Sequence, residues 1–178
     1  MKLLFGLLIT LLSCFPATAQ QVIISGQEGN RPLKWSDFTG RPDQSSPHSA
    51  QCYWNIRWQY SGTEKKDGKT IVKDFKVILE LDPKKTWRKK GKETDELLQH
   101  EQGHFNNGLL CQKELLERVN TNQFSTANAN AEIQQLVNEV LKKYQQQENT
   151  YDKETDHSKN KEGQQKWDLF FEKALSAN

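Results

Sequence analysis

The chain has 178 residues, which is enough for one domain and excludes an array of several domains. Only 34% of the residues are hydrophobic, 27% are charged and the mean hydropathy is −0.89, so we expect a modest core that a metal, a disulfide or a partner helps to stabilise. The formal net charge of +2 excludes the strongly basic surface that nucleic-acid-binding proteins present. Five Trp, four Tyr and eight Phe nevertheless indicate a folded chain and not a disordered one.

Residues 1–19 have the pattern of a secretory signal peptide. Lys2 and an apolar run too short to span a bilayer precede Ala17-Thr18-Ala19, a small-x-small triplet of the kind that signal peptidase cleaves. Lipoprotein processing is the second interpretation, because Cys14 ends a Leu-Leu-Ser-Cys segment similar to a lipobox. Both interpretations predict an exported protein, periplasmic or secreted, with one domain over residues 20–178. Membrane attachment is expected only if Cys14 is lipidated.

The predicted domain keeps two cysteines, Cys52 and Cys111. An even number of cysteines in an oxidising compartment is compatible with one disulfide. Two buried free thiols are the alternative, and the sequence does not give the distance that would decide between them.

Alternating apolar residues predict strands in the first half of the chain. The segments Cys52–Tyr60 and Ile71–Leu81 both alternate, and Asp67-Gly68 between them is a turn signal, so the two segments are predicted to pair as a hairpin. Val22–Ser25 is a weaker third strand. Arg31–Ser49 is rich in Pro, Ser and Gly, which predicts an ordered loop.

The second half has helical periodicity. Thr94 is a suitable N-cap for a first helix that runs to about Val119. A second helix is expected after Ser125 or Thr126, fading in the run Gln145–Gln147. A third helix carries the apolar residues Trp167, Phe170, Phe171 and Leu175. A small antiparallel sheet followed by three helices is an α+β arrangement.

The first predicted helix contains His100-Glu101-Gln102-Gly103-His104, an HExxH motif. Residues four apart on a helix differ by about 40° in azimuth and about 6 Å in rise, so both imidazoles can reach one ion. Zinc is the ion that best suits two neutral imidazoles. Glu101 then lies beside the open coordination position, where it can take a proton from a metal-bound water and pass it to a leaving amine.

A zinc site of this kind needs a third protein ligand. One candidate is His157, which lies in a polar segment predicted to be a loop between the second and third helices. A Glu from the following helix is the other plan, with Glu132 or Glu139 as candidates. The remaining histidine, His48, is expected to be a surface residue.

Four short motifs occur in the order W-x-D-F-x-G, H-E-Q-x-H-F, Y-D-x-x-T-x-H and Q-x-x-W. They lie at residues 35–40, 100–105, 151–157 and 164–167. In these motifs the chain resembles the predicted secreted zinc-dependent proteases of bacteria, an exported group catalogued as a domain of unknown function. One departure is Ser158, where the pattern of that group has Gly.

The resemblance implies a zincin-like fold, in which a small sheet packs on the active-site helix, and it implies hydrolysis of a peptide or protein substrate. Our hypothesis assigns His100, His104 and His157 to zinc and makes Glu101 the general base and acid. Tyr151 is the candidate donor of a hydrogen bond to the oxyanion of the tetrahedral intermediate, with packing at a helix end as its alternative.

Two further carboxylates and two further functions complete the expectations. Asp152 or Asp156 is predicted to orient a ligand imidazole from outside the coordination sphere, or else to cap the next turn. A non-catalytic envelope binding module with a structural zinc site is the alternative function. Such a site would normally be closed by four protein ligands. A hydrolase that acts on peptidoglycan cross-links is a third.

Overall fold

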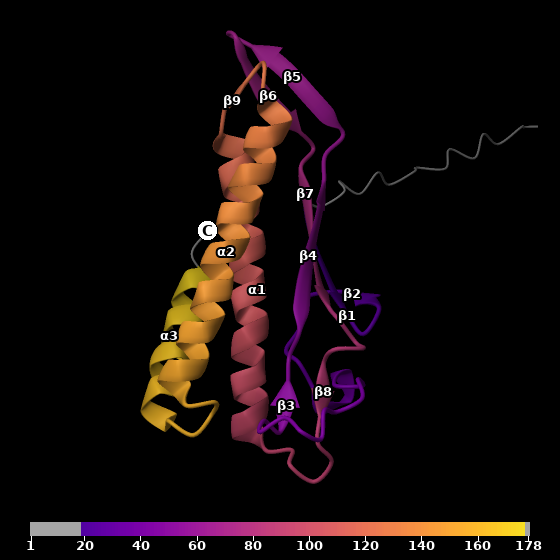
Figure 1. Ribbon diagram of the computed structural model, residues 1–178, viewed down its shortest axis with the longest axis vertical. Coiled ribbons are helices and arrows are strands. Elements are labelled where there is room, and N and C mark those ends of the chain that lie inside the picture. The colour runs from indigo at the N-terminus through magenta and orange to yellow at the C-terminus, as the bar shows by residue number, and fades with distance from the viewer. Residues whose placement is uncertain (1–18, 177–178) are drawn as a thin grey trace, which may run out of the picture.

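The computed structural model describes residues 19–176. Strands come first in the chain and three long helices second, which confirms the predicted α+β class (Figure 1). The main sheet has the strand order β2-β1-β7-β4. It consists of β1 (Gln20–Ile24), β2 (Gln27–Glu28), β4 (Trp54–Gln59) and β7 (Lys76–Leu81). β1 runs parallel to β7, whereas the pairs β1–β2 and β4–β7 are antiparallel, so the sheet is mixed.

The predicted pairing of the two alternating segments is confirmed by the β4–β7 ladder, but the hairpin between them is wrong. The turn at Asp67-Gly68 belongs to a separate hairpin that stands at one end of the molecule (Figure 1). Its strands are β5 (Gly62–Lys66) and β6 (Lys69–Lys73), and β6 also pairs with β9 (Phe124–Ser125). Residues 71–81 are not one strand because Asp74, with φ 51°, adopts a left-handed conformation that ends the extended run.

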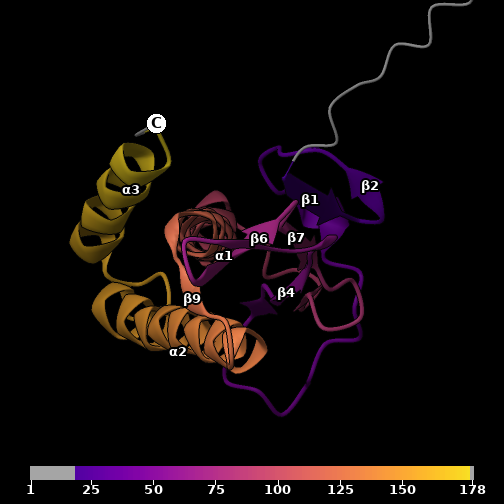
Figure 2. The ribbon, with the colours of Figure 1, turned by 90° about the horizontal axis from the view of Figure 1, so that it is seen from above.

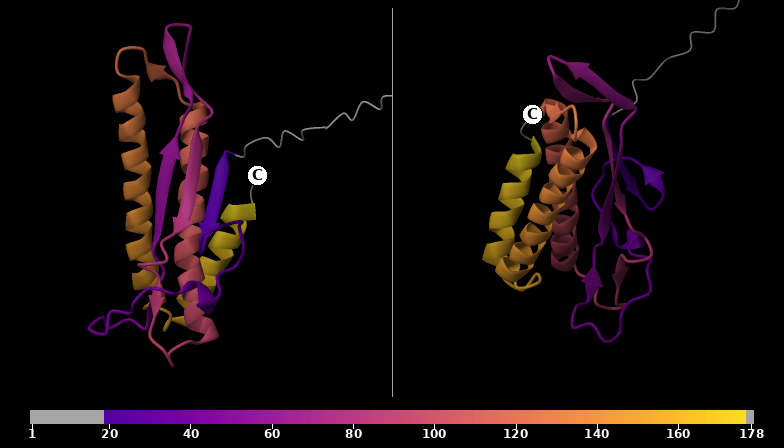
Figure 3. Two further views of the ribbon diagram at one scale, coloured as in Figure 1. Left: turned by 90° about the vertical axis from the view of Figure 1, so that its right-hand side faces the viewer. Right: turned by 45° about the horizontal axis from the view of Figure 1, so that its top comes forward.

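The three helices are α1 (Asp95–Thr121), α2 (Ala129–Thr155) and α3 (Lys161–Ser176). The side chain of Thr94 accepts a hydrogen bond from the Leu97 backbone, which confirms the predicted N-cap of α1. Seen from above, α1 lies between the sheet and the other two helices (Figure 2). It follows the long direction of β4 and β7 (Figure 3). Gly108 permits this approach, because a Cβ there would lie 2.8 Å from the Leu79 side chain.

α2 is longer than the sequence suggested, and the loop predicted over residues 151–157 is wrong for most of its length. The helix continues to Thr155, and the chain turns only at Asp156, whose φ is 45°. Glutamine is a good helix former, so the glutamine run does not end the helix. The buried stripe also continues through Tyr144, Tyr151 and Thr155 at spacings of seven and four.

The loop before β4 is ordered, as predicted, by the W-x-D-F-x-G motif. Residues Trp35–Asp37 form a 3₁₀ turn, and Asp37, 3% exposed, accepts hydrogen bonds from Ser25 and from both terminal nitrogens of Arg31. Phe38 packs in the apolar cluster that includes Val22 and Ile24 of β1. Because its residues serve burial and pairing, this motif has a structural role.

The two cysteines within the described residues are free. Cys52 and Cys111 are both buried thiols, which decides the alternatives against a disulfide. Cys52 follows the short strand β3 (Ala50–Gln51), which pairs with β8 (Trp87–Arg88). Cys111 lies in α1 within the larger apolar cluster, where burial raises its pKa to about 12.

The predicted leader lies outside the described residues, apart from Ala19, whose carbonyl accepts a hydrogen bond from Val77. Cleavage after Ala19 would leave Gln20, the first residue of β1, at the new N-terminus. Within residues 19–176, no helix combines the length and the apolar character that crossing a membrane requires.

Asp37 makes the stability of the fold depend on pH. Its hydrogen bonds with Arg31 hold its pKa at about 2, below the value of about 3.9 in an unfolded chain, so its stabilising contribution is full above about pH 5 and is lost as the pH falls towards 2. We expect Asp37→Asn to reduce the free energy of unfolding at pH 7, and this deficit to shrink by about 2 kcal/mol at pH 2. Urea titrations at both pH values measure the difference.

The exposed carboxylate variant Glu117→Gln serves as the control for removal of a negative charge. A deficit of Asp37→Asn that is the same at pH 7 and pH 2 would contradict the assignment.

Candidate metal centre

Three histidines meet at one carboxylate oxygen. Asp152 Oδ1 lies 3.2 Å from His100 Nε2, 3.1 Å from His104 Nε2 and 3.2 Å from His157 Nδ1. Within the described part of the chain, ligand atoms of His100, Asp152 and His157 form a group whose members are all within 4.8 Å of one another. The structure therefore brings the three histidines that the sequence proposed as ligands to one oxygen of Asp152, although His104 is not a member of the compact group.

The outer nitrogen of His100 faces hydrogen-bond acceptors. His100 Nδ1 lies 3.3 Å from both Gln164 Oε1 and Thr155 Oγ1. The Thr155 hydroxyl donates its proton to the Tyr151 carbonyl at 2.7 Å, so its oxygen is an acceptor towards the imidazole. These partners assign a hydrogen to Nδ1 of His100 and leave the lone pair of the neutral ring on Nε2.

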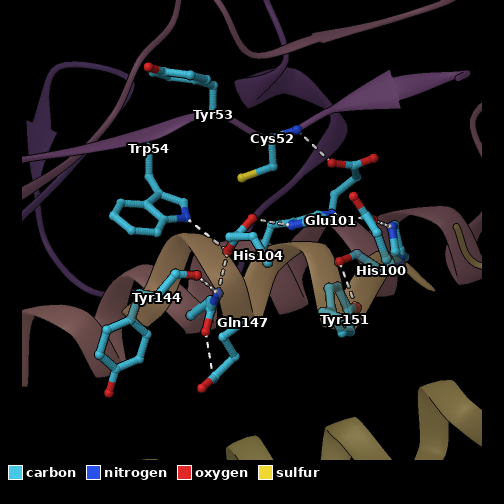
Figure 4. A network of polar contacts seen from close by, with 12 residues as sticks. Cys52, Tyr53, Trp54, His100, Glu101, His104, Tyr144, Gln147 and Tyr151 are labelled. Atoms are coloured by element: carbon cyan, nitrogen blue, oxygen red, sulfur yellow. Dashed lines mark hydrogen bonds and ion pairs between the residues drawn. The ribbon is translucent and has the colours of Figure 1, made fainter. Parts of the chain in front are cut away.

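The outer nitrogen of His104 has the same kind of partner. Its Nδ1 lies 2.5 Å from Glu148 Oε2, and the other oxygen of Glu148 accepts from Asn107 at 2.6 Å and from the indole of Trp54 at 3.3 Å. Gln147 in turn donates to Asn107, which completes the network in Figure 4. This network joins β4, α1 and α2 and fixes the Nε2 of His104 towards Asp152.

The arrangement fits a cation. The Nε2 atoms of His100 and His104 lie 3.2 Å and 3.1 Å from one oxygen of Asp152, and in neutral rings these acceptors repel one another unless a positive charge lies between them. Nitrogen and oxygen donors of this kind suit zinc. Burial lowers the pKa of His104, but the nearby carboxylates of Glu148 and Asp152 outweigh burial and raise this pKa. An extra proton on the ring is thus another way in which the site can hold a positive charge.

Glu101 lies in the cleft with these residues. The cleft has a volume of about 740 Å³, and residues 47–53 form one wall of it while α1 and the end of α2 form the others. Glu101 is 3% exposed, its Oε2 accepts a hydrogen bond of 2.6 Å from the Cys52 backbone, and burial raises its pKa (Figure 4). The hydrogen bond fixes the position of the carboxylate, and burial favours its neutral form.

Tyr151 does not face the cleft, so the expected contact with an oxyanion does not fit its placement. Its hydroxyl donates to the His100 carbonyl at 2.9 Å and accepts from Gln164, and its ring is fully buried. The ring stacks on His100 with centroids 4.8 Å apart. It also packs on Gly103, where a Cβ would lie 2.1 Å from the hydroxyl oxygen. The packing alternative describes Tyr151 better.

Neither glutamate proposed as the third ligand lies at the site. Glu132 accepts from the Ser125 backbone at the start of α2, and Glu139 pairs with Arg118. The helix that follows α1 does reach the histidines, but with residues that lie several turns later.

Sequence reasoning missed Glu148, and it named Asp152 or Asp156 as the carboxylate near a ligand imidazole without choosing between them. Because the second helix was ended too early, its last turns were not treated as a helical face. The signal that could have found them is the spacing of Glu148, Asp152 and Thr155 at four and three residues, which places them on one face of α2. Asp156 is exposed and lies 4.0 Å from Lys159, so it is the less suitable of the two aspartates.

His48 is exposed, as predicted, yet it lines the same cleft. Its ring centroid is 4.4 Å from that of His157. The chain has four histidines, so all of them lie at this one site.

His157 lies in a turn of three consecutive left-handed residues. Asp156, His157 and Ser158 have φ angles of 45°, 50° and 79°. The turn is closed by a hydrogen bond of 3.1 Å from the His157 backbone to the Asp152 carbonyl. Glycine adopts positive φ at little cost, which gives a physical reason for the glycine that the related pattern has at the position of Ser158.

The fold and the site define an α+β protein with a histidine and carboxylate centre between two antiparallel helices. A family of bacterial proteins of unknown function, DUF922, matches residues 23–158, and the chain belongs to this family. No curated protein and no solved structure matches the chain.

Gly103 is predicted to be intolerant of any side chain. Alanine normally stabilises a helix interior by about 1 kcal/mol relative to glycine, but here its methyl group would displace the buried ring of Tyr151. We expect Gly103→Ala to lower the free energy of unfolding by about 1–3 kcal/mol, as overpacking does elsewhere.

Gly62→Ala, in strand β5, is the control for an added methyl group without close neighbours, since nothing lies within 4 Å of a Cβ at that position. Denaturant titration of both variants measures the effect. A stabilised Gly103→Ala protein would show that Tyr151 is free to move.

Proposed function

We propose that the protein is a zinc-dependent hydrolase of peptide bonds that acts after export. The observation that carries the proposal is that Glu101 and the Nε2 atoms of His100 and His104 occur together in one cleft, with the outer nitrogens of both rings already held by acceptors. An ordinary helix with two surface histidines would not have buried partners for both rings.

In this proposal His100, His104 and His157 hold the zinc ion. When bound, zinc supplies a Lewis acid that polarises a carbonyl group and increases the acidity of water. Glu101 acts as the general base and then as the general acid, and the backbone N–H of Cys52 fixes the carboxylate that moves the proton. Glu148 and Gln164 orient the two rings.

The packing of α1 against the mixed sheet supports a zincin-like arrangement, because the motif helix lies directly on β4 and β7 (Figure 1). A cleft of about 740 Å³ is large enough for a segment of peptide. Lys92 and Lys159 line it, and they favour substrates with acidic groups near the cleaved bond.

A specific observation also favours the alternative, a non-catalytic envelope module with a structural zinc site. Asp152 supplies a fourth protein group at the histidines, and sites closed by four protein ligands are usually structural. An intact and buried Glu101 in the same cleft is not needed for that function, and for this reason we rank hydrolysis first.

Two measurements on the same preparations test the proposal: zinc per chain, and hydrolysis of a quenched-fluorescence peptide library. We expect wild type to hold one zinc and to cleave peptides. Glu101→Gln should keep the zinc and lose activity by about 10²–10⁴-fold, whereas His104→Ala should lose the zinc.

Glu117→Gln, an exposed glutamate on the same helix, is the matched control and should keep both properties. Full activity in Glu101→Gln would refute the role of that carboxylate. Stoichiometric zinc without hydrolysis of any peptide in wild type would favour the structural module.

A further inference from the structure

The two carboxylates of α2 contact different sides of the histidine rings. Glu148 contacts Nδ1 of His104, whereas the other nitrogen of that ring contacts Asp152. Asp152 contacts Nε2 of both His100 and His104. A carboxylate that only orients a ligand contacts the nitrogen that the metal does not use. Glu148 has that position and Asp152 does not.

The same oxygen of Asp152 also contacts the third histidine. Its Oδ1 lies 3.2 Å from His157 Nδ1, so one atom is close to all three candidate ligand nitrogens. An ion bonded to these nitrogens therefore lies next to the carboxylate. The backbone carbonyl of Asp152 also accepts a hydrogen bond from the His157 N–H. Asp152 therefore contacts His157 through both its side chain and its backbone.

With both rings neutral, hydrogen bonding does not explain the arrangement. A carboxylate oxygen accepts protons, whereas the outer partners of His100 and His104 leave lone pairs on both Nε2 atoms of the neutral rings. Acceptors that face acceptors are stable only around a positive charge, which is either an extra proton or a metal ion. The donor set of three imidazoles and one carboxylate carries a single negative charge, which suits a divalent ion.

We propose that Asp152 is a direct ligand of the metal, together with His100, His104 and His157, so that the chain supplies four ligands. This inference rests on the zinc site of the proposed function, and it raises the number of protein ligands in the absence of substrate from three to four. A catalytic water must then bind as a fifth ligand or replace a protein ligand. His157 is the residue that can leave, because its side chain is 42% exposed, against 32%, 11% and 3% for the other three.

Cobalt substitution tests the direct bond. In a Cys52→Ser background, which removes the native thiol of the cleft, we replace Asp152 by cysteine and load the full-length protein with Co²⁺. A thiolate bound to cobalt gives an intense charge-transfer band in the near ultraviolet, whereas a thiol outside the coordination sphere gives none. We expect the band in Asp152→Cys and its absence in Glu148→Cys, the matched control on the same helix.

One bound cobalt per chain without the band in Asp152→Cys would overturn the inference. If Asp152→Cys fails to fold, chelator competition on Asp152→Asn and Glu148→Gln decides. Loss of an outer partner costs about 10–100-fold in zinc affinity. We expect Asp152→Asn to lose more than 100-fold and more than Glu148→Gln, and an equal or smaller loss would overturn the inference.

These outcomes separate the two proposals. Wild type that binds neither zinc nor cobalt would reject the metal centre itself. Wild type that binds zinc and cleaves peptides, with unchanged zinc affinity in Asp152→Asn, would reject only the direct bond.

Discussion

The contact between the ring of Tyr151 and the bare backbone of Gly103 sets how closely α2 approaches α1, and the geometry of the site depends on that distance. With no Cβ between them, the ring can stack on His100 while its hydroxyl reaches the His100 carbonyl. Asp152 is the next residue along α2, so the same contact delivers its carboxylate to the histidines. The x positions of HExxH are therefore not free in this protein. Gln102 is used as well, since its side chain accepts from the Leu33 backbone at 2.7 Å.

The partners of the site come from every layer of the molecule. Trp54 reaches it from the sheet, Asn107 from α1, Glu148 from α2 and Gln164 from α3. Among the described residues, no buried side-chain nitrogen or oxygen is without a hydrogen-bond partner. In this chain of low apolar content, the polar network is fully hydrogen-bonded. A buried polar group without a partner would lower the free energy of unfolding by about 1–3 kcal/mol. The same bonds hold the fold together and aim the imidazoles.

Local patterns in the sequence were sufficient for much of this structure. Thr94 caps α1, the HExxH spacing places both imidazoles on one face, and the alternation of apolar residues identifies β4 and β7 as strands. Each of these signals depends on residues within a few positions of one another. The parallel pairing of β1 with β7 joins strands about fifty residues apart in sequence, and no local period encodes it.

The site was predicted in part for the same reason. His157 was found from its residue type, but the roles of Glu148, Asp152 and Tyr151 depend on where α2 ends and on how it lies against α1. Their direction towards or away from the histidines is a tertiary property. A polar run was interpreted as the end of a helix, although the buried stripe continued through it.

The match to the family ends at residue 158, three residues before α3 begins. Gln164 of α3 is nevertheless an acceptor for His100 Nδ1, and Trp167 packs on Tyr151 and donates to Glu154. The structural unit that makes the site is thus longer than the stretch by which the family is defined. A domain that ends at residue 158 would contain all four proposed ligands. It would still lack Gln164, which contacts the ring of His100.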